Sequence, residues 1–371
     1  MKRSLNRITR GAAACFALLL IIILTKVVTG WRCELRGRIH PPQSQPAERQ
    51  AATAGIPNYA RAEDDTFLSY PEWYIVWSYQ EKADFQEHHL PSGFPYFDAV
   101  GQYWSSYCCI SRLLEGNYSA NIGEQLMLVV IGTSFSAEYI LKGAYEKTIG
   151  RLSERSSAND FTQEDEFSYR VARDYADFVH VRPFYEFHFA RRVPALWNGT
   201  DLWGLHPMRK WERKIFLTAD YAIEAFYCWT IEKLTHLTYG YEPSETYLWI
   251  ENVSPASLAA TAQVKTIKQV GAKSWIVSIP RYQEFTRVVS NLAADDVRFT
   301  EIAGNTQIAV SAIVPATWTY EGPEVQLLFS APILTSTPMK RVMLSADVSA
   351  LHLVIKNLQK VNAPVEHVYD Y

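Results

Sequence analysis

The chain has 371 residues, a length that suggests two or three domains. Hydrophobic residues make up 48% of it and charged residues 20%, a balance that excludes a disordered chain. A formal net charge of −3 argues against nucleic acid as the main partner. The 11 Trp and 22 Tyr can fill a sizeable core and still supply rings for a groove or an interface.

An apolar segment follows a short basic leader at the N-terminus. The leader is residues 1–10 and the segment is residues 11–30, whose twenty residues suffice for a helix across about 30 Å of hydrocarbon. A cleaved signal peptide is the alternative, because the uncharged run from Gly11 to Thr25 has only 15 residues. The sequence before Trp31 is a poor cleavage site. We therefore expect a retained signal anchor, a single transmembrane helix.

The charges around this segment leave its orientation open. Basic residues flank both ends, so the positive-inside rule gives nearly equal weight to the two orientations. A short basic leader usually stays in the cytoplasm, which favours an extracytoplasmic, periplasmic body and a place in the cell envelope. Cysteine usage does not decide the compartment. The sequence also leaves open whether disulfides form among the four cysteines outside the apolar segment: Cys33, Cys108, Cys109 and Cys228.

The next two stretches predict a stalk and a helical domain. Residues 31–62 are rich in Pro, Gln, Ala and Ser and predict a disordered stalk. Residues 63–240 predict an aromatic-rich helical domain, because apolar residues there recur at helical spacing. The expected helices cover about 71–86, 98–116, 124–152, 164–181 and 218–237. The last has one mainly apolar stripe: Ala219, Ile223, Phe226, Thr230, Leu234 and Leu237.

The helix expected over 124–152 contains an apolar stretch that could also be a second membrane span. The uncharged run between Glu124 and Glu138 has 13 residues, the length of a buried core helix rather than of a span. Charged residues then recur every fourth position, at Glu138, Lys142 and Glu146, as on a helix with one wet face. We expect a core helix.

The pattern changes to period two after Pro243, which predicts a C-terminal domain over 241–371. Two strand-helix-strand segments are similar, WIVSIP to VRFTEI and RVMLSA to VEHVYD. Two β-α-β units side by side predict a ferredoxin-like α/β sandwich, so the fold class is α+β. The expected strands are 246–252, 264–270, 274–279, 297–303, 307–314, 325–330, 341–345 and 365–371, with helices at 282–294 and 349–361.

The strongest group of polar residues lies in the segment RDYADFVHVRPFYEFHF. Asp177 and His180 are three residues apart on one expected helix, a spacing that lets a carboxylate and an imidazole share a proton or a metal ion. The alternative is structural, with these side chains paired to one another at a junction between helices. The candidate catalytic residues are Asp177, His180, Arg182, Glu186 and His188.

Other chemistry has less support. The sequence has no phosphate-binding loop and no G-x-S-x-G, H-E-x-x-H or C-x-x-C motif, and we expect no cofactor and no metal ion. Glu232 and His236 share a helix face but lack the matching pair of a di-metal site. The basic stretch 206–214 predicts a solvated helix start, with contact to anionic lipid or to an acidic partner as the alternative.

Aromatic residues crowd the first expected helix at too many angular positions for one buried stripe. We expect part of them to form a surface for a partner or ligand, with Trp73, Tyr74, Trp77 and Tyr79 as candidates. The alternative is a central helix that is buried all round. The sequence therefore favours a non-catalytic, membrane-anchored protein that binds a protein partner or a lipid-like, apolar ligand through its helical domain. A membrane-tethered enzyme with a site around His180 is the alternative.

Overall fold

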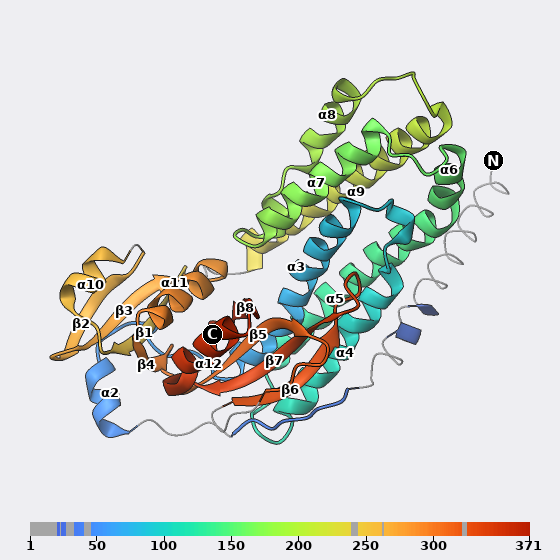
Figure 1. Ribbon diagram of the computed structural model, residues 1–371. Helices are drawn as coiled ribbons and strands as arrows, with labels where there is room; N and C mark the ends of the chain where they lie inside the picture. Colours follow the sequence, from blue (N-terminus) through green and yellow to red (C-terminus); the bar gives the residue numbers. More distant parts are fainter. Residues whose placement is uncertain are drawn as a thin grey trace. The chain divides into compact units, whose positions relative to one another are not determined.

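The computed structural model describes residues 21–22, 24–26, 33–40, 46–238, 244–261, 263–320 and 325–371 (Figure 1). Most of the predicted anchor at 11–30 lies outside the described residues. The chain folds into two compact units. The helical unit contains residues 73–108 and 126–240, and the mixed unit contains residues 33–72, 109–125 and 241–371.

Helices build the helical unit. The bounds are α3 (Asp65–Gln86, of which residues from 73 on belong to this unit), α4 (Tyr96–Leu114), α5 (Ile122–Tyr145), α6 (Arg151–Ser156), α7 (Gln163–Val179), α8 (Arg192–Gly199) and α9 (Pro207–Thr238). A π-helical turn, Glu146–Gly150, joins α5 to α6, and short 3-10 turns lie at Pro91–Gly93, Phe184–Glu186 and Phe189–Arg191. α7 begins at a capping box, in which Thr162 and Asp165 each accept a hydrogen bond from the other's backbone N–H.

Two helices begin earlier than the sequence predicts. α3 starts at Asp65 and carries Pro71 inside it, whereas the sequence predicts a start near Pro71 itself. Its first turns bury Phe67 and Tyr70, and this burial offsets the cost of an internal proline. α9 starts at Pro207 rather than near 218, so the basic stretch 206–214 is part of a long helix.

The aromatic residues of the helical unit pack mainly against one another. The Tyr103 ring lies over Gly132 of α5, so close that a Cβ there would be 2.0 Å from a ring carbon. Trp104 donates its indole N–H to the hydroxyl oxygen of Ser136, at 3.0 Å. Tyr139 is fully buried and contacts several neighbouring rings edge-on. The aromatic excess of this unit therefore goes largely into its core.

Two four-stranded antiparallel sheets form most of the mixed unit. The first has the order β2-β3-β1-β4 and the second the order β6-β7-β5-β8. Their bounds are β1 (Glu245–Glu251), β2 (Lys265–Gly271), β3 (Ser274–Pro280), β4 (Arg298–Ile302), β5 (Gln307–Pro315), β6 (Val325–Pro332), β7 (Met339–Asp347) and β8 (Val365–Val368). The central pairs are in register, with Trp249 opposite Ile276 and Val310 opposite Leu344.

The two β-α-β units lie in different sheets, so the single sheet expected from the repeat is wrong. The first unit is β3, α11 (Gln283–Ala294) and β4, and the second is β7, α12 (Leu351–Lys360) and β8. Another strand, β1 or β5, lies between the two strands of each unit. The sequence similarity shows that the two units are alike, but it does not specify which strands pair with each other.

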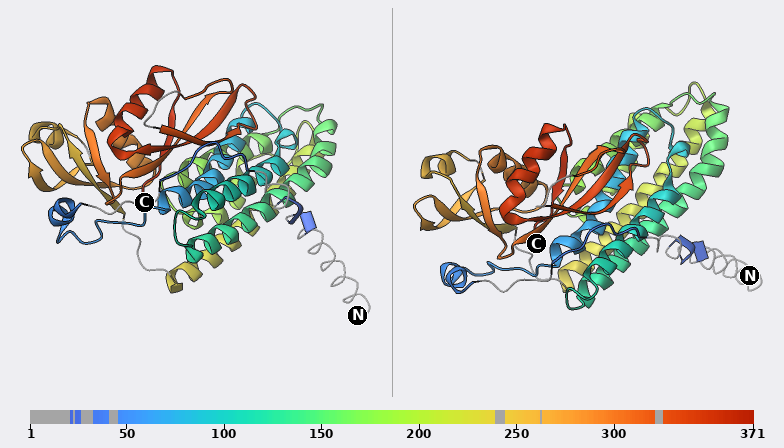
Figure 2. Two further views of the ribbon diagram at one scale, coloured as in Figure 1. Left: turned by 90° about the horizontal axis from the view of Figure 1, so that it is seen from below. Right: turned by 60° about the horizontal axis from the view of Figure 1, so that its bottom comes forward.

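Helices α11 and α12 hold the mixed unit together. They contact each other; α11 also contacts β3 and β8, and α12 contacts β4, β7 and β8 (Figure 2). One apolar core therefore includes residues of both sheets and both helices. The second sheet is covered on its other side as well, because the Thr66 hydroxyl donates to the Tyr369 carbonyl and the Tyr70 ring contacts Phe329. This coverage explains why β5 and β7 are buried on both faces.

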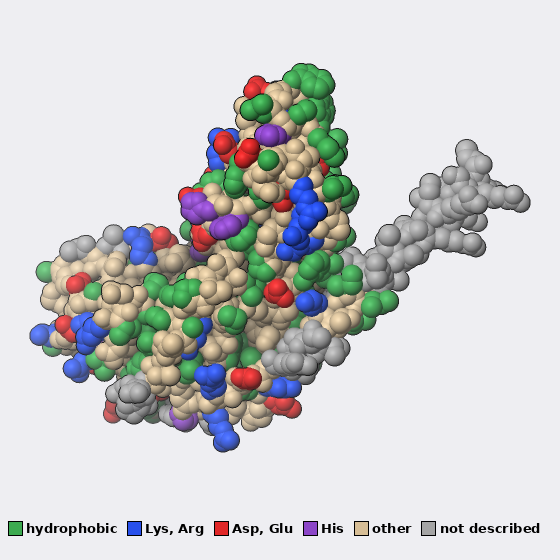
Figure 3. Space-filling model, turned by 45° about the vertical axis from the view of Figure 1, so that its right-hand side comes forward, with side chains coloured by type: hydrophobic (Ala, Val, Ile, Leu, Met, Phe, Trp, Pro, Cys, Tyr) green, Lys and Arg blue, Asp and Glu red, His purple; other side chains and the backbone are tan. Residues whose placement is uncertain are grey.

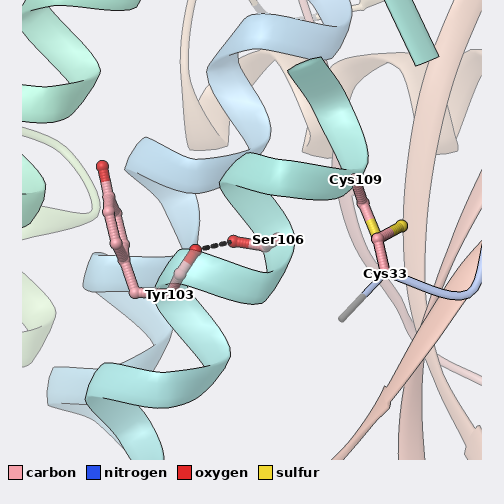
Figure 4. Close-up of a disulfide and its surroundings, with 4 residues drawn as sticks. All are labelled: Cys33, Tyr103, Ser106 and Cys109. Carbon is pink, nitrogen blue, oxygen red and sulfur yellow. Dashed lines mark hydrogen bonds between the residues drawn. A yellow bond between two sulfur atoms is a disulfide. The ribbon is translucent and has the colours of Figure 1, made fainter. Parts of the chain in front are cut away.

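Residues 33–40 and 46–62 are part of the mixed unit, so the predicted disordered stalk is wrong for these residues. Cys33 forms a disulfide with Cys109 of α4, with the Cα atoms 5.1 Å apart (Figure 4). The backbone N–H of Arg36 donates to the carbonyl of Leu328, at 2.8 Å. Further along, a short helix, α2 (Ala47–Thr53), precedes Tyr59, whose buried hydroxyl donates to Glu301. Backbone bonds and the disulfide order this stretch, although its composition is poor in large apolar residues.

Candidate functional site

The candidate catalytic residues around His180 do not converge. His180 caps the C-terminus of α7; its Nδ1 lies 2.7 Å from the Ala176 carbonyl and its ring contacts Trp73 edge-on. The other four side chains are exposed: Asp177, Arg182, Glu186 and His188. Arg182 and Glu186 form a loose ion pair at 3.8 Å. Among the described residues, no hydrogen bond or ion pair joins Asp177 to His180, so the spacing did not produce an acid–base pair.

The aromatic candidates of α3 are mostly buried, so the predicted aromatic surface is wrong for three of them. Trp73, Tyr74 and Trp77 are within the core, and Tyr79 is half-buried. The Tyr74 hydroxyl donates to the Ala99 carbonyl at 3.0 Å. The alternative of a central helix describes these three residues, because α3 has neighbours on several sides. A central helix can bury aromatic residues at many angles.

The basic stretch at the start of α9 is buried rather than solvated. Its four basic side chains are less than 5% exposed: Arg209, Lys210, Arg213 and Lys214. Arg209 pairs with Asp165 at 2.6 Å and with Glu212 at 3.1 Å. Arg213 pairs with Glu146 at 2.9 Å, and it also pairs with Glu212 at 3.0 Å. The helix start expected at 206–214 is present, because α9 begins at Pro207, but the expected solvation is wrong, and the buried side chains leave these four residues no basic surface for anionic lipid or an acidic partner.

Carboxylates from three helical segments compensate these buried positive charges. Glu164 lies 3.3 Å from the Lys210 ammonium and 3.2 Å from that of Lys214. Glu154 of α6 lies 3.6 Å from Arg209. A charge without a partner at such a depth would cost several kcal/mol, on the order of the stability of a whole domain. We call this set the α9 ion network, and its geometry indicates a structural role.

A second buried charge cluster is centred on Lys142 of α5. The Lys142 ammonium lies 2.9 Å from Glu138, 3.1 Å from Asp220 and 3.0 Å from Glu224. The Tyr79 hydroxyl donates to Glu138 at 2.6 Å. These groups line a cavity of about 40 Å³, which also borders α7. Lys82 lies at the same cavity, where burial lowers the pKa of its ammonium group and the nearby Lys142 charge lowers that pKa further.

The chemistry available in this cavity is limited. Its space suits about one water molecule, whereas ligand sites usually have about 300–1,000 Å³. The place that a cation would take between the three carboxylates is filled by the Lys142 ammonium. Over the part of the chain that the structure describes, no group of three or more His, Cys, Asp or Glu side chains is arranged to hold a metal ion. The His236 side chain lies outside the described residues, so the shared face of Glu232 and His236 stays a prediction.

Acidic residues also gather where α3 begins, in the mixed unit. Burial raises the pKa of the Glu63 carboxyl to about 7, against the opposing effect of a hydrogen bond with Tyr118. Burial and the neighbouring Asp64 raise the pKa of Asp65 to about 6. These carboxyls titrate near neutral pH and so make stability depend on pH.

The outer surface of α5 and α9 is apolar over most of its length. Every exposed side chain of α9 from Met208 to Trp229, a range that the structure describes in full, is apolar. From Leu126 to Ile149, the exposed positions of α5 and the π-turn are apolar or threonine. We call the following large side chains the α5–α9 face: Leu126, Val129, Val130, Leu141, Ile149, Met208, Ile215, Ile223, Phe226 and Trp229.

The exposed stripes of α5 and α9 form one continuous face. The helices are antiparallel, because Lys142 pairs with Asp220 while Glu146, one turn later on α5, pairs with the earlier Arg213. At 100° per residue, each exposed stripe lies about 110° from the side that contacts the other helix. When two neighbouring helices are antiparallel, two stripes that are rotated by the same angle from the contact side face the same side of the helix pair. Figure 3 shows hydrophobic side chains gathered along one edge of the helical unit.

Helix α7 presents the opposite character to solvent. Its exposed side chains are all polar or charged: Gln163, Glu166, Arg170, Asp174 and Asp177. α7 contacts α9 through Phe167 and Tyr221, and Tyr221 points about 135° away from the exposed stripe of α9. The helical unit therefore has one charged flank and one apolar flank.

Comparison of the chain with known protein families, with characterised proteins and with solved structures finds no match. The functional argument therefore depends on the geometry of these residues alone. The apolar flank was visible in the sequence as the stripe Ala219, Ile223 and Phe226, but an apolar stripe is usually taken as the core side of a helix.

Proposed function

We propose that this chain is a non-catalytic, membrane-anchored protein of the cell envelope whose helical unit binds an apolar partner through the α5–α9 face. The observation that carries this proposal is the exposure of that face, in which Ile223 and Phe226 are each 68% exposed. Burying an apolar side chain of this size gains about 1.5–3 kcal/mol. A partner that covers the face is therefore strongly favoured over water.

The arrangement of the polar residues supports a non-catalytic role. Catalysis needs an acid, base or nucleophile beside a space that can hold a substrate. The five residues around His180 lie apart, and none of them lines the described cavity. In that cavity Lys142 is already paired with three carboxylates. The alternative of a membrane-tethered enzyme gains no support from these positions.

The Cys33–Cys109 disulfide supports a periplasmic, extracytoplasmic body behind a retained single-pass anchor at 11–30. Disulfides form and persist in oxidising compartments and are rare in the cytosol. Cys33 follows the anchor by only a few residues, so the disulfide would form close to the membrane surface on its extracytoplasmic side.

The duplicated sheets support a finer description of the mixed unit. The order β2-β3-β1-β4, with α10 (Pro255–Ala260) and α11 as connections, is that of a ferredoxin-like β-α-β-β-α-β motif. β5 to β8 repeat the order, with a loop in place of the first helix. We propose that the mixed unit consists of two such repeats in tandem. The binding of the apolar partner is assigned to the helical unit, which carries the α5–α9 face.

Cysteine accessibility in native membranes tests whether the face is covered. Phe226→Cys and its matched control Asp177→Cys, both in the full chain, are labelled with a water-soluble maleimide, and reaction of the wild-type chain is subtracted. We expect Cys at 177 to react at least tenfold faster than Cys at 226 in membranes. Equal rates in membranes would show that nothing covers the face, and the proposed function would then be wrong.

A further inference from the structure

We propose that the partner of the α5–α9 face is the hydrocarbon of a lipid bilayer, and that the helical unit lies on its side in the membrane surface with α7 turned to water. The inference rests on the proposed function, because it names the partner of the same face. It adds a second membrane contact to the predicted anchor.

The threonine hydroxyls that lie among or beside the side chains of this face are bonded within their own helices. The Thr133 hydroxyl donates to the Val129 carbonyl at 2.7 Å. The Thr148 hydroxyl donates to the Ala144 carbonyl at 2.6 Å, and further along α9 Thr230 donates to the Phe226 carbonyl. A protein interface usually exchanges hydrogen bonds, about one for each 100–200 Å². Hydrocarbon exchanges none, so a face whose hydroxyls are bonded internally matches lipid.

Within residues 126–146 and 208–229, the charged side chains are placed as they are in proteins that contact lipid, whereas Lys233, near the end of α9, is exposed. Charged side chains at membrane depth face the interior of a bundle and pair there. Glu138, Lys142 and Glu146 of α5 and the π-turn all point inward and are paired. The sequence argument against a second membrane span used only the length of the uncharged run in α5. It did not consider on which face of the helix the charged residues lie. The structure separates a charged inner side from an apolar outer side.

The charged flank decides how the unit meets the bilayer. The helical segment Ile122–Ser156 is long and apolar enough to cross a membrane by length and composition. A bundle that crossed, however, would place the exposed charges of α7 in hydrocarbon as well. An in-plane position covers the apolar flank and leaves Arg170, Asp174 and Asp177 in water.

Side chains at one end of the face suit the headgroup region. The loop before α9 exposes Trp203 at 73% and Leu205 at 84%, and the Trp203 ring contacts Trp211 of α9. Aromatic residues of this kind concentrate at the interface between hydrocarbon and water. The exposed Arg151 and Arg155 of α6, which contacts α9, complement anionic phospholipid headgroups.

Photocrosslinking of the full chain in native membranes tests the inference. A photoreactive phenylalanine derivative is placed at Phe226, at Leu141 as a second site on α5, and at Asp177 as the control on α7. Adducts are identified by mass. We expect phospholipid adducts at 226 and 141 that are at least tenfold more abundant than at 177. Leu141 also keeps the test valid where the variant at 226 does not fold.

The other outcomes separate the two proposals. A discrete protein adduct at 226 and 141 would overturn the lipid inference and keep the proposed function. Adduct yields at both sites no higher than at 177, with rapid labelling of Cys at 226, would overturn both. Abundant lipid adducts at all three positions would show a bundle surrounded by hydrocarbon, which contradicts the in-plane arrangement.

Discussion

Helices α7 and α9 are neighbours in the same unit, and they expose opposite kinds of side chain. α7 exposes charged and polar residues such as Arg170 and Asp174, whereas α9 exposes Ile223 and Phe226. At its buried side α9 carries Arg213, a residue type that α7 leaves in water. The difference teaches that a helix face is selected for the medium that covers it. The two flanks of this unit therefore differ in polarity, as the proposed lipid contact requires.

Charge inside α9 has a cost that α7 avoids. An exposed charge on α7 needs no partner, because water solvates it. A buried charge on α9 is stable only with a carboxylate at contact distance, as Arg213 has in Glu146. If the comparison is correct, changes on the inner side of α5 and α9 must disturb the fold far more than changes on the outer side of α7.

The largest expected effect follows from removing one member of the α9 ion network. Arg213→Ala leaves Glu146 and Glu212 buried without the guanidinium, and we expect a loss of about 3–5 kcal/mol in unfolding free energy. Asp177→Ala, on the exposed side of α7, should stay within about 0.5 kcal/mol. Denaturant unfolding of the detergent-solubilised full chain, followed by circular dichroism, measures both. Equal effects would remove the distinction between the two sides.

A smaller effect is expected from adding one methyl group to the inner side of α5. Gly132→Ala would place a Cβ 2.0 Å from the Tyr103 ring, and overpacking of this kind costs about 1–3 kcal/mol. The matched control is Gly101→Ala in α4, where the new Cβ meets nothing within 4 Å. Because alanine favours a helix over glycine, this variant should gain about 0.5–1 kcal/mol. Thermal unfolding of both variants decides, and a gain in stability of similar size in both would mean that Tyr103 is not packed on α5.

The smallest effect concerns pH and lies in the mixed unit. The pKa of Glu63 is raised to about 7 in the folded chain from an ordinary value of 4.5. Its stabilising contribution is therefore complete below about pH 4.5 and is lost as the pH rises through 7. We expect the melting temperature to fall by roughly 2 °C between pH 5 and pH 8 through this group, and Glu63→Gln to flatten that part of the profile. An unchanged slope in the variant would show that Glu63 is not buried as described.

The sequence predicted the local structure of the mixed unit well and its assembly poorly. Period two located each strand within a few residues, because alternation depends only on neighbours along the chain. Strand pairing depends on contacts far apart in sequence, so the division into two sheets was missed. The ordered structure of residues 33–40 and 46–62 was not predicted for the same reason, since it depends on the bond to Cys109 and on backbone contacts such as that of Arg36 with β6.

The candidate site was misjudged because periodicity shows a stripe but not the medium that covers it. The stripe through Ile223 and Phe226 was recognised in the sequence, yet nothing in it marked that stripe as the outer one. The basic residues on the buried side of α9 also form a pattern that is visible in the sequence. Arg209 and Arg213 are four residues apart and lie about 100° and 140° around the helix from Phe226, and a basic pair at that spacing on a long helix indicates a paired interior as readily as a wet surface.

The π-helical turn between α5 and α6 bears on how this chain tolerates insertions and deletions. Glu146 and Glu154 both pair with arginines of α9, although eight residues of regular helix would leave them about 80° apart around the axis. The turn absorbs one residue, so that the two carboxylates differ by only about 20°. Losing one exposed residue there, such as Thr148, would yield a regular helix with the same phase on both sides. A deletion in the middle of α5 would instead rotate all that follows by about 100° and carry Lys142 away from its carboxylates.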